Sequence, residues 1–144
     1  MDVATKHTRV QESLLSRPER RVLLWLARHM PDWVKPDHLT ALGVVGAVGV
    51  LLGYALSSIH PAYLWLAVLG FVLNWFGDSL DGTLARYRKH ERPRYGFFID
   101  HTVDVVNEML MFLGIGLSPF ADFRAAAFAL ISYMALSTLA YINM

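Results

Sequence analysis

The stretch DSLDGTLARYRKHERPRYGFFIDHTVD, residues 78–104, decides how this chain folds. Apolar segments flank it on both sides, yet it contains four aspartates at regular intervals. Asp78 and Asp81 are three residues apart, and Asp100 and Asp104 are four apart. Because residues at these separations share one face of an α-helix, the stretch predicts two helices, each with a stripe of carboxylates, joined by a polar loop.

Small and basic residues continue both stripes. One and two turns after Asp78 come Gly82, Ala85 and Arg86, and Gly96 opens the second stripe. Two such helices facing each other would bring four carboxylates into one small volume. The small residues would let a ligand approach the helix backbones closely, and the planar guanidinium of Arg86 suits a phosphate.

Four ionised carboxylates in a low-dielectric site repel one another, and each costs roughly 2.5 to 3.5 kcal/mol at membrane depth. A cation is therefore expected to bind there. The chain contains no cysteine, so the oxygen-rich site favours Mg²⁺ or Mn²⁺ over zinc. Four shared carboxylates suit two such ions, the arrangement used for phosphoryl displacement. The pattern predicts a metal-bound diphosphate as the ligand.

At these residues the chain resembles the CDP-alcohol phosphotransferase family, integral membrane enzymes of phospholipid synthesis. The family pattern is D-x-x-D-G-x-x-A-R, a gap, then G-x-x-x-D-x-x-x-D, and every specified position is matched here. Nine residues separate Arg86 from Gly96, where eight is common in the family. The additional residue falls in a polar loop, where insertion is well tolerated.

The resemblance implies a reaction and a role for each residue. An acceptor hydroxyl would attack the β-phosphorus of a CDP-alcohol and release CMP. Asp104 would contact the second metal ion and act as general base, which requires hydrogen-bond reach to that hydroxyl. The metal ligands would be Asp78, Asp81, Asp100 and Asp104. The nucleotide and diphosphate would be bound by Gly82, Ala85, Arg86 and Gly96.

The segment PDHLT, residues 36–40, predicts a helix start with proline in the first turn and Asp37 as the capping residue. Family members often carry Pro-Asn-x-x-Thr there, so Asp37 replaces the usual asparagine. Thr40 is by this resemblance a substrate-binding candidate, with a helix start and nothing more as the alternative.

The composition independently predicts a membrane protein. Hydrophobic residues make up 55% of the chain and charged residues only 17%, against about 25% for soluble domains. The apolar segments are 39–57, 62–77, 105–117 and 125–142. Because about 20 residues cross a bilayer, the middle two span only if the aspartate stripes belong to the same helices. We predict an all-α polytopic bundle of about four transmembrane helices, where the family usually has six.

The charges predict the orientation. Every lysine and arginine except Arg124 precedes the first span or lies in residues 86–94, so the positive-inside rule places the active site and both termini of this chain in the cytosol. Four basic residues of the polar loop are interpreted as topology determinants, with attraction of anionic lipid or substrate headgroups as the alternative: Arg88, Lys89, Arg92 and Arg94.

The sequence also predicts two regions. Residues 1–36 form a cytosolic lead that includes an interfacial amphipathic helix at 17–30, with Trp25 and Trp33 at headgroup depth. Packing of that helix on the bundle is the alternative. Residues 37–144 form the catalytic bundle, expected to be incomplete at its carboxyl end.

The expected partners are a CDP-alcohol, with CDP-diacylglycerol one candidate, an acceptor alcohol and the bilayer, and no nucleic acid. A homodimer is expected because dimerisation is common in the family. His101 could contact substrate or a neighbouring helix, and Glu108 could bind the acceptor or a partner helix. Two rival functions stay open: a divalent-cation transporter and a catalytically silent membrane scaffold.

Overall fold

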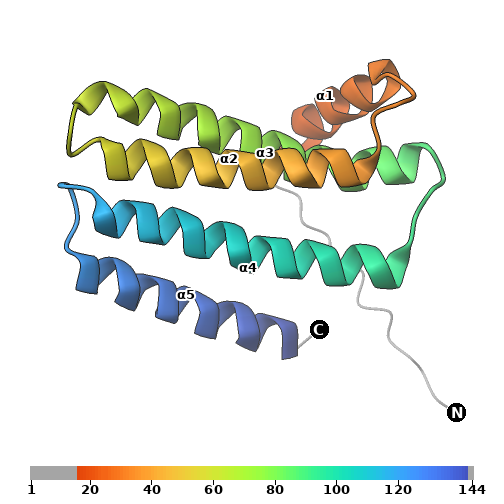
Figure 1. Cartoon of the computed structure of the whole chain (residues 1–144). Coiled ribbons are helices and arrows are strands. Elements are labelled where there is room, and N and C mark those ends of the chain that lie inside the picture. The colour runs from red at the N-terminus through yellow and green to blue at the C-terminus, as the bar shows by residue number, and fades with distance from the viewer. Residues whose placement is uncertain (1–15, 143–144) are drawn as a thin grey trace, which may run out of the picture.

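The computed structural model of the chain describes residues 16–142, which form helices and short connections without any β-strand (Figure 1). The elements are α1 (Ser16–His29), α2 (Pro36–Leu56), the short 3₁₀ helix η1 (Pro61–Tyr63), α3 (Leu64–Tyr87), α4 (Pro93–Leu117) and α5 (Phe123–Ile142). The all-α prediction is confirmed. Both aspartate stripes lie within long helices, because each stripe continues into an apolar segment without a break.

The four long helices run up and down beside one another, and α1 lies against one end of α3 (Figure 1). Helix α2 is central, because it packs on both α3 and α4, while α5 packs mainly on α4. The start of α2, the end of α3 and the start of α4 lie at the same end of the bundle. This topology gathers the conspicuous polar residues of the sequence in one place.

Glycines allow α2 and α3 to approach at backbone distance. A Cβ atom at Gly46 would lie 2.6 Å from the carbonyl oxygen of Gly70, and a Cβ at Gly70 would lie 2.6 Å from the carbonyl oxygen of Gly46. On α4, a Cβ at Gly114 would lie 2.7 Å from the Cα of Leu51 in α2. Small residues are typical of closely packed membrane helices, and here they fix the spacing between the elements that carry the site.

Within residues 16–142, three helical segments are long and apolar enough to cross a membrane: Pro36–Leu56, Pro61–Tyr87 and Phe123–Ala140. Helix α4 has comparable length but carries the second carboxylate stripe. Many large apolar side chains point outward, including Trp65 (76% exposed), Phe128 (73%) and Leu136 (68%). Such outward apolar surface suits contact with lipid.

A small apolar core lies at the polar end of the bundle. Leu23 and Ala27 of α1 are buried with Leu39 of α2 and with Leu80 and Leu84 of α3. Full burial of a leucine side chain contributes about 1.5 to 3 kcal/mol. Helix α1 therefore packs on the bundle, while Trp25 and Trp33 are exposed.

Arg88 fastens the α1–α2 connection to the end of α3. Its guanidinium donates hydrogen bonds to the carbonyl oxygens of Met30 (3.0 Å), Pro31 (2.9 Å), Asp32 (3.4 Å) and Val34 (2.5 Å). A guanidinium can satisfy several carbonyls at once because its donors are arranged as a planar fork. Arg88 is thus a structural tether, beyond the topological role that its charge suggests.

The prediction that Asp37 caps α2 is wrong. Lys35 occupies the capping position, and its backbone N–H donates to Nδ1 of His38 (3.3 Å). Pro36, which lacks an N–H and has a helical φ, takes the first helical position. The cap therefore falls one residue before the proline, and Asp37 is free to bind elsewhere.

Candidate active site

Three of the four carboxylates of the sequence pattern converge between α3 and α4, both of which pack on α2. Asp78 of α3 and Asp100 and Asp104 of α4 each offer a carboxylate oxygen, and these oxygens all lie within 4.8 Å of one another. Opposite ligands of an octahedral Mg²⁺ ion, with bonds of 2.0 to 2.1 Å, are about 4 Å apart. The three residues therefore fit the expected hard cation with small side-chain rotations.

Electrostatics favours a cation at this position. Two like unit charges about 4 Å apart repel by about 1 kcal/mol in water and about 4 kcal/mol at the effective dielectric typical of a protein surface. Asp78 and Asp100 are exposed and Asp104 is half-buried, so their repulsion lies between these limits. A bound divalent cation would attract all three carboxylates and so outweigh their mutual repulsion.

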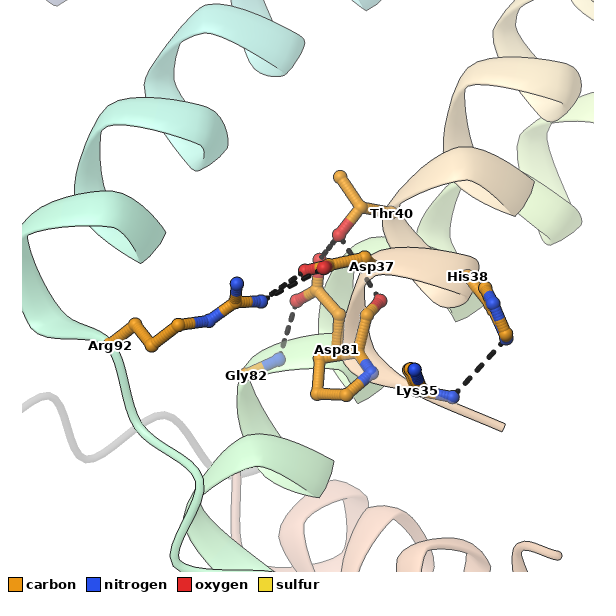
Figure 2. A network of polar contacts seen from close by, with 8 residues as sticks. Lys35, Asp37, His38, Thr40, Asp81, Gly82 and Arg92 are labelled. Atoms are coloured by element: carbon orange, nitrogen blue, oxygen red, sulfur yellow. Dashed lines mark hydrogen bonds and ion pairs between the residues drawn. The ribbon is translucent and has the colours of Figure 1, made fainter. Parts of the chain in front are cut away.

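Asp81 lies outside this group of three but beside it. Its carboxylate accepts a hydrogen bond from the Thr40 hydroxyl (2.6 Å) and one from the backbone N–H of Gly82 (2.5 Å) (Figure 2). Together with Asp78 and Asp100 it lines a small crevice between the helices. Thr40 of α2 thus orients a carboxylate of α3. The sequence alone did not predict this role for Thr40.

A larger pocket of about 260 Å³ opens next to the carboxylates. Its lining includes every substrate-binding residue that the sequence predicted, together with two of the aspartates: Thr40, Asp81, Gly82, Ala85, Arg86, Gly96 and Asp100. This volume is close to the lower end of the usual range for small-molecule sites. The resemblance and the structure therefore point to the same cavity.

The two glycines of this pocket serve different purposes. A Cβ at Gly82 would lie 3.3 Å from Nη1 of Arg86, whose Nη2 donates to the Thr83 hydroxyl (3.3 Å). Gly82 therefore leaves room for the guanidinium. A Cβ at Gly96 would meet no protein atom within 4 Å, so that position faces open space in the pocket.

An ion pair crosses the rim of the same pocket. Arg92 donates to both carboxylate oxygens of Asp37 (2.7 and 2.9 Å) (Figure 2). Its guanidinium carbon lies 4.4 Å from the ring centroid of Tyr95. The Asp37 carboxylate raises the pKa of Arg92 through this hydrogen bond. Exposed ion pairs contribute little stability, typically below about 1 kcal/mol, so its chief effect is to connect the start of α2 with the loop that precedes α4.

Two further ionisable residues of α4, His101 and Glu108, have contacts of their own. Nδ1 of His101 lies 2.8 Å from the carbonyl oxygen of Phe97, and the two rings are 3.9 Å apart between centroids. Glu108 lies beside Tyr133 of α5. For Glu108 the structure therefore shows the helix contact, one of the two alternatives that the sequence left open.

These features define an integral membrane helical bundle with an acidic, cation-compatible centre beside a pocket. The sequence profile of the CDP-alcohol phosphatidyltransferase family matches residues 33–144. The chain belongs to this family.

Curated relatives agree with that assignment. The chain is 34% identical over 84 residues to phosphatidylinositol phosphate synthase from Cutibacterium acnes, covering 58% of this chain and 38% of that protein. It is 30% identical over 112 residues to cholinephosphotransferase 1 from Homo sapiens (74% and 27%), and 31% identical over 101 residues to archaetidylinositol phosphate synthase from Methanothermobacter thermautotrophicus (70% and 49%). The chain thus spans half or less of the length of these relatives. No solved structure matches it significantly.

The Thr40–Asp81 hydrogen bond gives a first prediction. Thr40→Val removes the only side-chain donor that the described residues direct at Asp81, and Thr40→Ser keeps it. Residues that orient a metal ligand typically change metal affinity by 10- to 100-fold when replaced. We expect Thr40→Val to bind Mn²⁺ about 10-fold more weakly than Thr40→Ser, as measured by electron paramagnetic resonance. Equal affinities would show that Thr40 does not support the metal centre.

Proposed function

We propose that the chain transfers a phosphoalcohol or phosphatidyl group from a CDP-alcohol to an acceptor alcohol in phospholipid synthesis, releasing CMP. The observation that carries this proposal is the convergence of Asp78, Asp100 and Asp104 within 4.8 Å, in a member of the CDP-alcohol phosphatidyltransferase family. The neighbouring pocket supplies a place for the nucleotide. A carboxylate cluster alone would be compatible with many functions, so the family membership gives the cluster its specific meaning.

Asp78, Asp100 and Asp104, with Asp81 beside them, would hold Mg²⁺ or Mn²⁺, and we propose two ions. When bound, such ions neutralise a diphosphate and stabilise the departing phosphate. Thr40 keeps Asp81 in place through its hydroxyl. All of these ligands are oxygens, in keeping with the hard character of the expected cations.

Other residues of the pocket would position the substrates. Arg86 would bind the diphosphate through its guanidinium, while Gly82, Ala85 and Gly96 keep the pocket open for the nucleotide. Asp104 would accept the proton of the acceptor hydroxyl as its oxygen bonds to the β-phosphorus and the bond to CMP breaks. The half-buried position of Asp104 suits a base that must reach a substrate from within the bundle.

The substrate proposal is restricted to what the relatives share. The names of the relatives refer to different reactions. One names the transfer of phosphocholine, and the others name the synthesis of phosphatidylinositol phosphate or archaetidylinositol phosphate. We therefore propose a CDP-alcohol donor, with CDP-diacylglycerol one candidate, and an acceptor alcohol whose identity is left open. The basic residues near the pocket support a cytosolic active site and cytosolic ends of this chain, and a homodimer is proposed by analogy with the family.

Release of CMP tests this function. In liposomes, the chain should release CMP from a CDP-alcohol when Mg²⁺ or Mn²⁺ and a suitable acceptor are present, and removal of the cation by a chelator should stop release. A panel of CDP-alcohols and acceptors would identify the substrates. Cation flux across the liposome without CMP release would instead support a transporter, and cation binding with neither activity would support a scaffold.

A further inference from the structure

Asn107 of α4 is a buried polar residue that the proposed reaction leaves without a role. It lies three residues after Asp104, and only 5% of its surface is exposed. Its side-chain oxygen Oδ1 has no hydrogen-bond partner among residues 16–142. A buried acceptor without a donor loses its hydrogen bonds to water and gains none in return, so this arrangement calls for a physical explanation.

The amide of Asn107 lines the crevice beneath the carboxylates. The crevice has a volume of about 10 Å³ and is also lined by Thr40, Asp78, Asp81 and Asp100. A space of roughly 10 to 15 Å³ is the minimum that holds one water molecule. Because Asp78 and Asp100 are exposed while Asn107 is buried, the amide lies at the inner end of the acidic site.

Helix packing does not account for this amide. Asn74, on helix α3, shows what a packing amide does: its Nδ2 donates to the carbonyl oxygen of Gly43 in α2 (3.0 Å). No comparable bond is formed by the Oδ1 of Asn107 within the described part of the chain. The group that satisfies it is therefore expected to come from the crevice.

We propose that Asn107 is the inner binding residue of the metal centre, its amide oxygen holding the cation bound by Asp78 and Asp100, directly or through one water molecule. The inference rests on the metal centre of the proposed function and adds a residue to it. Amide oxygens are ordinary ligands of hard cations. An uncharged ligand also strengthens binding without adding to the repulsion among the carboxylates.

The test compares Mn²⁺ binding and thermal unfolding in Asn107→Leu, Asn107→Asp and the control Asn74→Leu, all in detergent. Asn107→Leu should bind Mn²⁺ about 10-fold more weakly, while its Tm without metal should equal or exceed that of the unmodified protein, because an unpaired buried acceptor has been removed. Asn107→Asp should bind Mn²⁺ at least as tightly as the unmodified protein and have a lower Tm without metal.

Asn74→Leu should lower the Tm and leave Mn²⁺ affinity unchanged, because its amide is already bonded within the protein. Unchanged Mn²⁺ affinity in Asn107→Leu, or weaker binding in Asn107→Asp, would overturn the role of Asn107 and leave the proposed function standing. Absence of Mn²⁺ binding by the unmodified protein would overturn the metal centre itself, and both proposals with it.

Discussion

Asp100→Asn should reduce CMP release by about 10³-fold or more. Asp100 belongs to the group of three converging carboxylates and also lines the pocket and the inner crevice. Its replacement removes a negative charge from the centre of the cation site. Metal-assisted charge stabilisation is worth several kcal/mol in a transition state, and about 4 kcal/mol corresponds to the expected loss. Nucleotide release from liposomes measures it.

Asp122→Asn provides a matched control for this substitution. The Asp122 carboxylate accepts hydrogen bonds from the backbone N–H groups of Arg124 (2.9 Å) and Ala125 (3.2 Å) at the start of α5. Asparagine caps helices about as well as aspartate, so this variant should keep both its fold and its activity. If the activity of Asp100→Asn were within 10-fold of this control, Asp100 would not be essential for the reaction.

Gly46→Ala should lower the thermal stability by about 10 °C. A Cβ at this position would lie 2.5 Å from the backbone nitrogen of Asn74 and 2.6 Å from the carbonyl oxygen of Gly70, and neither atom can rotate away. Overpacking of this kind costs about 1 to 3 kcal/mol, which for a chain of this size corresponds to such a shift. The separation of α2 and α3 should also weaken the Thr40–Asp81 hydrogen bond and so reduce activity.

Gly49→Ala is the matched control on the same helix. There a Cβ would lie 3.5 Å from the Cα of Gly70, an ordinary van der Waals contact. Its Tm in detergent should stay within a few degrees of the unmodified protein. Similar Tm values for Gly46→Ala and Gly49→Ala would show that close backbone contact between the helices does not limit stability.

The helices and the acidic cluster were predictable because both depend on short-range spacing. The separations of Asp100 and Asp104 from each other, and of the apolar residues around them, follow the helical period and need no knowledge of the remainder of the chain. The predicted convergence of Asp78 and Asp81 with this stripe required the additional assumption that two helices face each other, and the structure places Asp78 in the cluster and Asp81 beside it. That assumption follows from burying polar stripes inside a bundle in an apolar solvent.

The long-range partners could not be predicted in the same way. Thr40 is 41 residues from Asp81, and Asp37 is 55 residues from Arg92, and no periodic pattern connects such positions. The environment of Asn107 is similar: its place one turn beyond Asp104 is visible in the sequence, but the missing partner of its amide depends on how α2 and α3 pack. The prediction that Asp37 caps α2 was wrong because it assumed a local partner for this side chain, whereas its partner, Arg92, is distant in the sequence.

The tether formed by Arg88 constrains the order in which the protein can assemble. The carbonyl groups that it binds precede it by 54 to 58 residues, so they leave the ribosome well before it does. This tether to α1 consequently cannot form until α3, the second of the four long helices, has been made and inserted. During biosynthesis, docking of α1 is therefore completed late, after the hairpin of α2 and α3 has formed.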